Sequence, residues 1–355
     1  MQLLCLCKRC PQARDLFTQP YGRFYHIPRL LAARGYAVHL LLLSYQNEPN
    51  AFHQEVNLHS HSVSALPWGL LPYMIKAKHL MIEVQPDWVI GFSDSWYGIL
   101  AQRLAGRFGA RCLIDAYDNY ESYIPWLVPL HSQWRKALRQ ADVVTAAGPQ
   151  LADWMSQSAG DRPVDVVPMA ADPLFFPRDK IMCRNSLGLP VDARLMGYSG
   201  SLHPNRGIEL LFQVFERLRK HLPDLELVLS GRLSKGINIP FGVHWLGYRP
   251  AEEVPLILNS LDLLFVMNKP SAFGNFSYPV KLYEAMACGV PVVASDVPGT
   301  AWILRDRPKS LARAEDAEDF VKKALAILER GERGDILPSG WEGSAATFAR
   351  LCEIN

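Results

Sequence analysis

No apolar run in this 355-residue sequence is long enough to cross a bilayer. Strong net charge is also missing, because the formal charge is only +2, which removes the bulk electrostatic case for a nucleic-acid-binding protein. The opening residues, MQLLCLCKRC, place a short apolar run directly before charged residues, a pattern that does not predict a signal peptide. We therefore expect a cytoplasmic protein that binds no nucleic acid, and the surface of a membrane stays open as a partner.

Two familiar motifs, G-x-G-x-x-G and D-x-D, are absent. Cysteines number seven, an odd count, and Cys5, Cys7 and Cys10 lie close together. A metal or redox site is one interpretation of that group. Small apolar side chains on a first strand are the other, which we favour because no second Cys/His group follows at ligand spacing. The residues therefore predict no metal site and no bound cofactor, and scattered cysteines fit a reducing compartment.

Buried strands alternate with amphipathic helices along most of the chain. Apolar runs such as QLLCLC, YAVHLLLLSY and ADVVTAAG predict strands covered on both faces, and WYGILAQRLAGRFG is typical of the helices between them. The pattern restarts after the Pro-rich segment PVDVVPMAADPLFFPRDK, with five further strands. This alternation predicts two doubly wound, parallel α/β domains facing a cleft. We place the first domain at 1–170, the second at 171–339, and a final helix at 340–355 that packs back on the first.

The stretch SYPVKLYEAMACGVPVVASD combines a short helix with a buried strand. Pro279 suits the first turn of a helix that we predict over residues 280–288, Gly289 suits its end, and residues 290–294 form an apolar strand. Lys281 and Glu284 are three residues apart and share a helix face. The free N–H groups at the helix start favour an anion, beside which a lysine suits phosphate and a carboxylate one turn further suits a pair of hydroxyls. The alternative is a surface ion pair on an ordinary helix.

Two glycines and an arginine stand at other strand-to-helix turns. In GYSGSLHPNRGIELL, Gly200 permits close backbone approach, and Arg206 stands where a guanidinium can meet a phosphate. Gly22 leaves room for a ligand before the first helix. A solvated residue at the helix entry is the alternative for Arg206, and a plain turn glycine is the alternative for Gly22.

The segment LIDAYDNYESYIP places Asp115, Asp118 and Glu121 after a buried strand. A carboxylate at that strand end is suited to accept a proton from an attacking hydroxyl. The alternative for Asp118 is that it caps a helical turn.

Four segments carry a family resemblance: GSLHPNRGIELL, HWLGY, YPVKLYEAMACGVPVVASDVPG and GWEGSAATFARL. They resemble the retaining family 4 glycosyltransferases of the GT-B fold, and the resemblance covers nearly the whole chain. It implies two Rossmann-like domains, the first for the acceptor and the second for a nucleotide-sugar donor. It also implies transfer of a hexosyl-type sugar to a hydroxyl with retention. We expect the transfer to need no metal, because side-chain cations can meet the leaving group and no D-x-D motif is present. We expect the acceptor to be a glycan, a glycolipid or a lipid-linked molecule in bacterial envelope or exopolysaccharide synthesis.

The resemblance also assigns roles to particular residues. Glu284 matches the second glutamate of the family's E-x7-E motif, which holds the ribose hydroxyls. Arg206 matches the second member of a basic pair on the diphosphate, and Tyr248 with Arg249 matches the stretch that lines the nucleobase. Asp118 matches an acidic position of the acceptor domain.

Two positions depart from the family pattern. Phe276 stands where the first glutamate is expected, and Ser201 stands where the first basic residue is expected. Lys281 is then the candidate that restores charge at the diphosphate. The residues that we expect to be catalytic are Asp118, Arg206 and Lys281. Those expected to bind the donor are Gly22, Gly200, Ser201, Arg206, Tyr248, Arg249, Ser277, Tyr278, Pro279, Val280, Lys281 and Glu284.

Two other functions stay open, and the departures at Phe276 and Ser201 motivate the first of them. A non-catalytic nucleotide-sugar-binding partner subunit is one, and a GT-B sugar-nucleotide epimerase is another, although the sequence shows no additional acid and base residues for the latter. The segments ALPWGLLPYMIKAKH and IPWLVPLHSQWRKALRQ mix tryptophan, leucine, proline and basic residues. That mixture suits a peripheral membrane surface reaching a lipid-linked acceptor, but ordinary packing with basic caps is the interpretation that the sequence favours.

Overall fold

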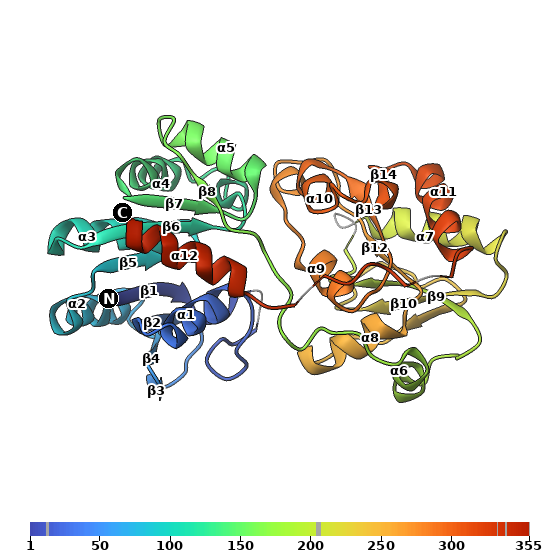
Figure 1. Cartoon of the computed structure of the whole chain (residues 1–355), viewed down its shortest axis with the longest axis horizontal. Helices are drawn as coiled ribbons and strands as arrows, with labels where there is room; N and C mark the ends of the chain where they lie inside the picture. The colour runs from blue at the N-terminus through green and yellow to red at the C-terminus, as the bar shows by residue number, and fades with distance from the viewer. Residues whose placement is uncertain (12–13, 204–206, 332, 338, 355) are drawn as a thin grey trace. The chain divides into compact units, whose positions relative to one another are not determined.

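The computed structural model describes residues 1–11, 14–203, 207–331, 333–337 and 339–354. The chain divides into two compact units, Met1–Met169 with Trp341–Asn355, and Ala170–Gly340. Each unit is built on a mostly parallel sheet with helices on both faces (Figure 1). The predicted doubly wound α/β class is therefore confirmed. Within the described part of the chain, no helix combines the length and apolar character needed to span a membrane.

The sheet of the first unit has the strand order β3-β4-β2-β1-β5-β6-β7-β8. Its strands are β1 (Gln2–Lys8), β2 (Ala37–Ser44), β3 (Ala51–Glu55), β4 (Leu58–Ser64), β5 (Trp88–Gly91), β6 (Arg111–Ala116), β7 (Val143–Ala146) and β8 (Asp165–Val166). All neighbours are parallel except β3 and β4. The β3–β4 hairpin was not predicted, because the β4 sequence LHSHSVS lacks the apolar run of a buried strand.

The helices of this unit are α1 (Arg23–Ala33), α2 (Leu71–Val84), α3 (Ser95–Phe108), α4 (Val128–Gln140), α5 (Pro149–Ser158) and α12 (Glu342–Ile354). Helix α12 belongs to the last residues of the chain but packs against α1. The Trp88 indole N–H on β5 donates a hydrogen bond to the carbonyl oxygen of Cys352 at 3.2 Å. Residues from both ends of the chain therefore complete one core.

A buried ion pair joins several elements of the first unit. The Arg23 guanidinium, at the start of α1, contacts both carboxylate oxygens of Asp115 on β6, at 2.7 and 2.5 Å. Thr145 on β7 donates to the same carboxylate at 2.6 Å, and Arg23 also donates to the carbonyl of Val167 at 2.7 Å. Both charged side chains are almost fully buried. The pair therefore fixes the start of α1 against two strands and the segment after β8.

The sheet of the second unit is entirely parallel, with the order β11-β10-β9-β12-β13-β14. Its strands are β9 (Arg194–Ser199), β10 (Leu225–Ser230), β11 (Val243–Trp245), β12 (Leu263–Val266), β13 (Val292–Asp296) and β14 (Leu311–Arg313). Its helices are α6 (Lys180–Leu187), α7 (Ile208–Arg219), α8 (Val254–Ser260), α9 (Val280–Ala287), α10 (Pro298–Ile303) and α11 (Ala317–Leu328). Buried residues such as Phe215, Phe265 and Phe320 fill the layer between the sheet and helices α7 and α11. Strand β14 was not predicted, because three residues carry too little pattern.

Replacing Arg23 by Met should destabilise the first unit by about 3–5 kcal/mol, because the buried Asp115 carboxylate loses its charged partner. The measurement is urea unfolding of the full chain. Arg194→Met is the matched control, because the Arg194–Asp224 pair is about half exposed and such pairs contribute about 0–1 kcal/mol. Equal small effects of the two substitutions would contradict a structural role for the Arg23–Asp115 pair.

Candidate active site

The carboxyl edge of the second sheet is where an open parallel α/β sheet binds its ligand. Gly200 follows β9 at this edge, and Gly231 follows β10. The Gly200 N–H donates to the carbonyl of Ser230 at 2.7 Å, and the Gly231 N–H donates to that of Gly247 at 2.8 Å. Both glycines have positive φ angles, and a Cβ on Gly231 would overlap the carbonyl oxygen of Gly200. The ends of β9 and β10 can approach this closely only because neither glycine has a side chain.

The Lys281 amine lies directly against Gly200. A Cβ on Gly200 would overlap Nζ of Lys281 and would lie 2.9 Å from its Cε. The same amine is 5.0 Å from the centre of the Tyr198 ring on β9. The structure therefore brings together two of the predicted donor-binding residues, and it places a cation over the end of a central strand.

Helix α9 carries Lys281 and Glu284, and it spans Val280–Ala287, close to the predicted bounds. Pro279 precedes the helix as its N-cap, with φ −66° and ψ 117°, so its predicted place in the first turn is wrong by one residue. The extended ψ ends the preceding loop before the helix begins. Lys281 and Glu284 are both half-buried on this helix. Their three-residue spacing places the two side chains on one face of the helix.

Helix α10 packs against the loop that precedes α9. A Cβ on Gly299 would overlap the Ser277 carbonyl oxygen, so the two backbones pack with no space for a side chain. The buried Tyr278 ring meets the Trp302 ring edge-on, with centroids 5.7 Å apart. These contacts fix the direction from which α9 enters the site. Phe276, in the short helix η5 (Gly274–Phe276) of the same loop, is half-buried.

Tyr248 and Arg249 follow β11, but their side chains differ in how far they are available to contact a ligand. The Tyr248 side chain is 57% exposed, and the Arg232 guanidinium carbon lies 4.9 Å from its ring centre. Arg249 instead donates to the carbonyl of Leu246 at 2.7 Å and contacts Glu253 at 3.2 Å. The open aromatic face therefore belongs to Tyr248, while the Arg249 guanidinium is engaged within its own segment.

Sequence reasoning missed two residues at this edge. Arg232 comes directly after Gly231 in LELVLSGR, and that position after a strand was the signal that could have found it. Asn268 lies just beyond β12, and its amide nitrogen is buried with no hydrogen-bond partner in the described part of the chain. A buried donor without a partner is costly, which makes Asn268 a candidate to contact a polar ligand.

Two other predicted residues, Ser201 and Arg206, add little to the description of the site. Ser201 is exposed, and its carbonyl accepts a hydrogen bond from the Tyr198 hydroxyl at 3.2 Å. Arg206 lies outside the described residues.

The predicted residues of the first unit lie at the carboxyl edge of its own sheet. Gly22 has a φ of 65° and immediately precedes α1. The Asp118 carboxylate accepts a hydrogen bond from the Tyr123 hydroxyl at 2.5 Å. Burial and the charge of Asp118 raise the pKa of Tyr123 well above its usual range, so that the hydroxyl stays a donor. Asp118 does not cap the following turn η2 (Tyr120–Ser122), because Asn119 occupies that position.

The other two carboxylates of the LIDAYDNYESYIP segment have partners of their own. Asp115 is buried against Arg23, and Glu121 contacts Arg135 at 2.6 Å. The three carboxylates therefore do not form one group of shared function, and Asp118 is the one that stays a candidate.

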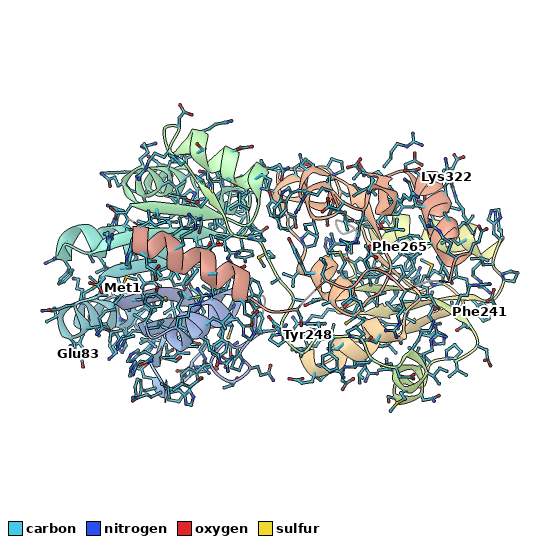
Figure 2. All side chains as sticks on the ribbon, viewed as in Figure 1. Met1, Glu83, Phe241, Tyr248, Phe265 and Lys322 are labelled. Atoms are coloured by element: carbon cyan, nitrogen blue, oxygen red, sulfur yellow. The ribbon has the colours of Figure 1, made fainter. Side chains whose placement is uncertain are left out.

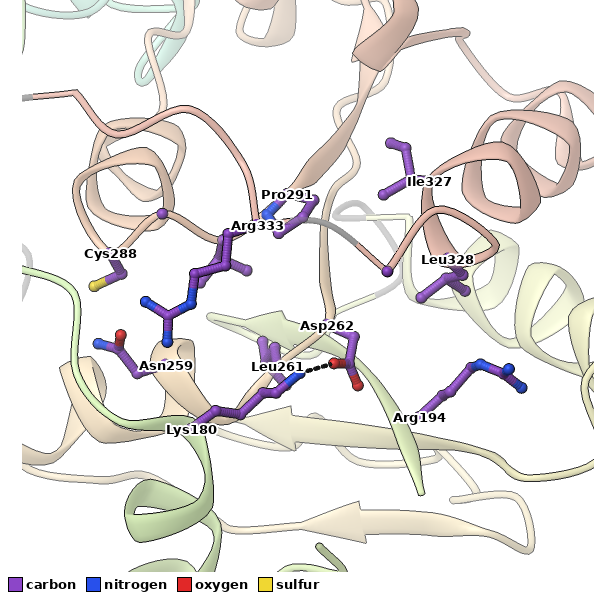
Figure 3. A pocket seen from close by; sticks show the side chains of 13 residues that line it. Lys180, Arg194, Asn259, Leu261, Asp262, Cys288, Pro291, Ile327, Leu328 and Arg333 are labelled. Atoms are coloured by element: carbon purple, nitrogen blue, oxygen red, sulfur yellow. Dashed lines mark hydrogen bonds and ion pairs between the residues drawn. The ribbon is translucent and has the colours of Figure 1, made fainter. Parts of the chain in front are cut away.

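A cavity of about 140 Å³ lies at the amino edge of the second sheet, where Leu261 and Asp262 precede β12 (Figure 3). Lys180 contacts Asp262 at 2.6 Å, and Arg194 contacts Asp224 at 2.7 Å. These cations are thus already neutralised by carboxylates. The cavity is also at the wrong end of the strands for the ligand site of an open parallel sheet.

Two protein-family sequence models match this chain, one in each unit. The one described as a glycosyl transferase 4-like domain matches residues 23–170, and the one described as glycosyl transferases group 1 matches residues 193–330. The D-inositol 3-phosphate glycosyltransferase of Stackebrandtia nassauensis is 29% identical over 205 residues, which are 52% of this chain and 45% of that protein. The protein of the same name in Mycobacterium tuberculosis strain H37Ra is 26% identical over 208 residues, 52% and 41% respectively. The chain therefore spans less than half the length of these curated relatives.

Solved structures confirm the GT-B fold. Sucrose-phosphate synthase from Thermosynechococcus elongatus has a TM-score of 0.74 and 18% identity, covering 100% of this chain and 94% of its own. The Anabaena protein HepE, in complex with UDP-glucose, has a TM-score of 0.69 and 16% identity, covering 100% and 97%. At such identities the likeness shows the fold alone. This fold and the two matching sequence models together show that the chain belongs to the family 4 glycosyltransferases.

Replacing Gly200 by Ala should be less damaging when Lys281 is already Ala. Gly200 has a φ of 143°, so the substitution strains the backbone by about 1–3 kcal/mol, and it also displaces the amine. In a double-mutant cycle measured by urea unfolding, the displacement should appear as a coupling of about 0.5 kcal/mol or more. Gly236→Ala is the control, because φ is also positive there, at 84°, but no atom of the residues that the structure describes lies within 4 Å of the new Cβ. Strict additivity of Gly200→Ala and Lys281→Ala would contradict the contact.

Proposed function

We propose that this protein transfers a sugar from a nucleotide-diphosphate donor to a hydroxyl acceptor, with retention at the anomeric carbon. The observation that carries the proposal is the Lys281 amine against Gly200, beside the N-terminus of α9. A cation and free N–H groups at the carboxyl edge of a parallel sheet suit a diphosphate. In this proposal the second unit binds the donor and the first unit binds the acceptor.

The donor would be a nucleotide sugar held by side chains of the segments that follow four strands, β9, β10, β11 and β12. Lys281 and Arg206 would meet the diphosphate, and Glu284 would accept hydrogen bonds from the ribose hydroxyls. Tyr248, with Arg232 over its ring, would pack against the base. The Anabaena relative in structure was solved with UDP and with UDP-glucose, which supports a uridine nucleotide as the first donor to test.

The proposed roles of the side chains follow from the place where negative charge develops during sugar transfer. Sugar transfer passes through an oxocarbenium-like transition state, and the leaving diphosphate gains negative charge as its bond breaks. Fixed cations and N–H groups at that place stabilise the transition state more than the ground state. In the retaining reaction that we propose, the acceptor hydroxyl attacks from the leaving-group side, and a phosphate oxygen takes its proton. Asp118, whose carboxylate is oriented by the Tyr123 hydroxyl, would position the acceptor.

The acceptor that we propose is a hydroxyl of a glycan, a glycolipid or a lipid-linked molecule, used on the cytoplasmic side in envelope or exopolysaccharide synthesis. The matched relatives are named D-inositol 3-phosphate glycosyltransferases, which is consistent with a phosphorylated polyol-like acceptor.

A non-catalytic subunit that binds a nucleotide sugar is the second candidate. Phe276 and Ser201 motivate it, because each replaces a charged residue of the family pattern. Donor binding without transfer to any acceptor and without slow donor hydrolysis would favour this alternative.

Lys281→Ala should lower kcat for sugar transfer by about 10²–10³-fold, with a smaller change in KM, because the charge that it meets is largest in the transition state. Steady-state release of the nucleotide diphosphate from a panel of nucleotide sugars measures the effect. Ser201→Arg in the Lys281→Ala background should recover part of the rate. A parental rate in Lys281→Ala would show that the leaving group is stabilised elsewhere.

Activity should persist in a strong chelator, because the proposed mechanism uses side-chain cations and backbone N–H groups in place of a divalent ion. The same assay is run after dialysis against EDTA, with and without added magnesium or manganese. Complete loss of transfer that either metal restores would reject the metal-independent mechanism and would leave the donor assignment intact.

A further inference from the structure

Three histidines lie side by side on the sheet of the first unit, and the proposed sugar transfer uses none of them. His39 is on β2, and His59 and His61 are on β4, the neighbouring parallel strand. The ring centroids of His39 and His59 are 4.7 Å apart, with an interplanar angle of 14°. Those of His39 and His61 are 5.7 Å apart, with an angle of 10°. The three imidazoles therefore form one stack across two strands.

A contact between ring nitrogens joins His39 to His61. Nδ1 of His39 lies 3.4 Å from Nε2 of His61. Such a contact is a hydrogen bond only while one of the two nitrogens carries a proton and the other accepts it. Two neutral imidazoles meet this condition. Two imidazolium ions carry N–H groups at every ring nitrogen, so that the contact becomes a repulsion between donors and between positive charges.

The surroundings of the stack favour uncharged rings. His61 is 9% exposed, and His39 is half-buried. The Phe52 ring of β3 covers the stack, with its centroid 4.9 Å from that of His61 and 6.3 Å from that of His59. On the other side of β2, the residue opposite His39 is the apolar Leu4 of β1. Burial lowers the pKa of both His39 and His61 from 6.5 to about 4.

Nearby charges act mostly in the same direction as burial. After burial, the groups that act on the pKa of His39 are His59, Glu83 and Lys76, in that order. Among these only Glu83, which lies on α2 of the first unit (Figure 2), favours the proton. The groups that act on His61 are Lys76, His39 and His59, and all three disfavour the proton. A proton on the stack is therefore weakly compensated.

Strand β3 supplies no carboxylate to the stack. Its residue Gln54 pairs with His59 across the hairpin and is uncharged. His53 and Glu55 alternate with the residues that face the stack, so they lie on the opposite face of the sheet. There Glu55 accepts a hydrogen bond from the Tyr25 hydroxyl of α1 at 3.0 Å.

Strand β4 connects the stack to the carboxyl edge of the sheet. Ser62 follows His61, and its hydroxyl accepts a hydrogen bond from Nη1 of Arg9 at 3.0 Å. The buried Arg9 guanidinium also contacts the carboxylates of Asp15, at 2.7 Å, and Glu48, at 2.8 Å. Arg9 thus holds the segments after β1 and β2 against β4, and displacing β4 removes one partner of a buried cation.

We propose that the stack of His39, His59 and His61 is a pH-sensitive switch that holds β4 in the sheet. At neutral pH the uncharged rings pack on one another and join β4 to β2. In acid, a state in which β4 has opened binds protons that the closed stack excludes, so protons favour opening. Opening also releases Ser62 from Arg9 and so loosens the carboxyl edge of the first unit. The inference goes beyond the proposed function, and its test needs no donor or acceptor.

The first test is urea unfolding of the full chain at pH values from 7.5 to 4.5. Because the folded-state pKa of about 4 lies below 6.5, the stabilisation is complete above pH 6.5 and is lost progressively toward pH 4. The double variant His39→Asn/His61→Gln keeps a polar atom near each interacting nitrogen but takes up no proton. Between pH 7.5 and 4.5, the unfolding equilibrium constant should rise at least about tenfold more in the parent than in this variant.

The matched control removes two other histidines of the same unit. The side chains of His53 and His79 are 61% and 63% exposed. His53→Gln/His79→Gln therefore changes the number of histidines equally but should keep the pH dependence of the parent. If the double variant of the stack is unstable at pH 7.5, the single variant His61→Gln provides the same comparison.

Hydrogen exchange locates the opening. Parent and double variant are compared at one pH, 5.0, where their intrinsic exchange rates are equal. Peptides that cover residues 51–64 should exchange faster in the parent than in the variant at pH 5.0, and equally at pH 7.5. Peptides from β9 and β10 of the second unit are the internal reference and should not differ.

Three outcomes would overturn the proposal. The first is an equal pH dependence of unfolding in the parent and the stack variant. The second is a control variant that removes as much of the pH dependence as the stack variant does. The third is equal exchange of the 51–64 peptides at pH 5.0, which would show that the three rings are packing residues without a role in the response to acid.

Discussion

The contact of the Lys281 amine with Gly200 is the constraint on which the candidate site depends. It requires that β9 end in a residue without a side chain, and it requires that α9 enter from one direction. The buried Tyr278 ring against Trp302, and the backbone of Ser277 against Gly299, supply that direction. Rigid packing behind the loop thus positions a flexible side chain in front of it, which is the arrangement that a preorganised electrostatic site needs.

The first unit depends on a buried ion pair in a comparable way. Arg23 and Asp115 join the start of α1 to β6, and Thr145 and Val167 complete their hydrogen bonds. Burying two charges is tolerated because both are paired and further hydrogen-bonded. The same pair removes Asp115 from the carboxylates available at that edge, so that Asp118 is left as the candidate to face an acceptor.

Charged and apolar side chains are distributed differently in the two units. The second unit gathers its cations and glycines at strand ends, where they suit a small anionic ligand. The first unit carries exposed tryptophans and, on its sheet, three stacked histidines.

The sequence by itself determined the α/β class, the restart of the pattern after the Pro-rich segment, and the bounds of α9, because uniform apolar runs and Pro/Gly punctuation act locally. It also singled out Lys281, Glu284, Gly200 and Tyr248, through spacing and family resemblance. Only the tertiary structure decided that Lys281 lies on Gly200, that Arg232 covers Tyr248, and that Asp115 is neutralised by Arg23. It alone also showed that Trp68 and Trp126 face outward. The physical reason is that these facts join residues from separate strands and helices, and local patterning carries no information about such pairs.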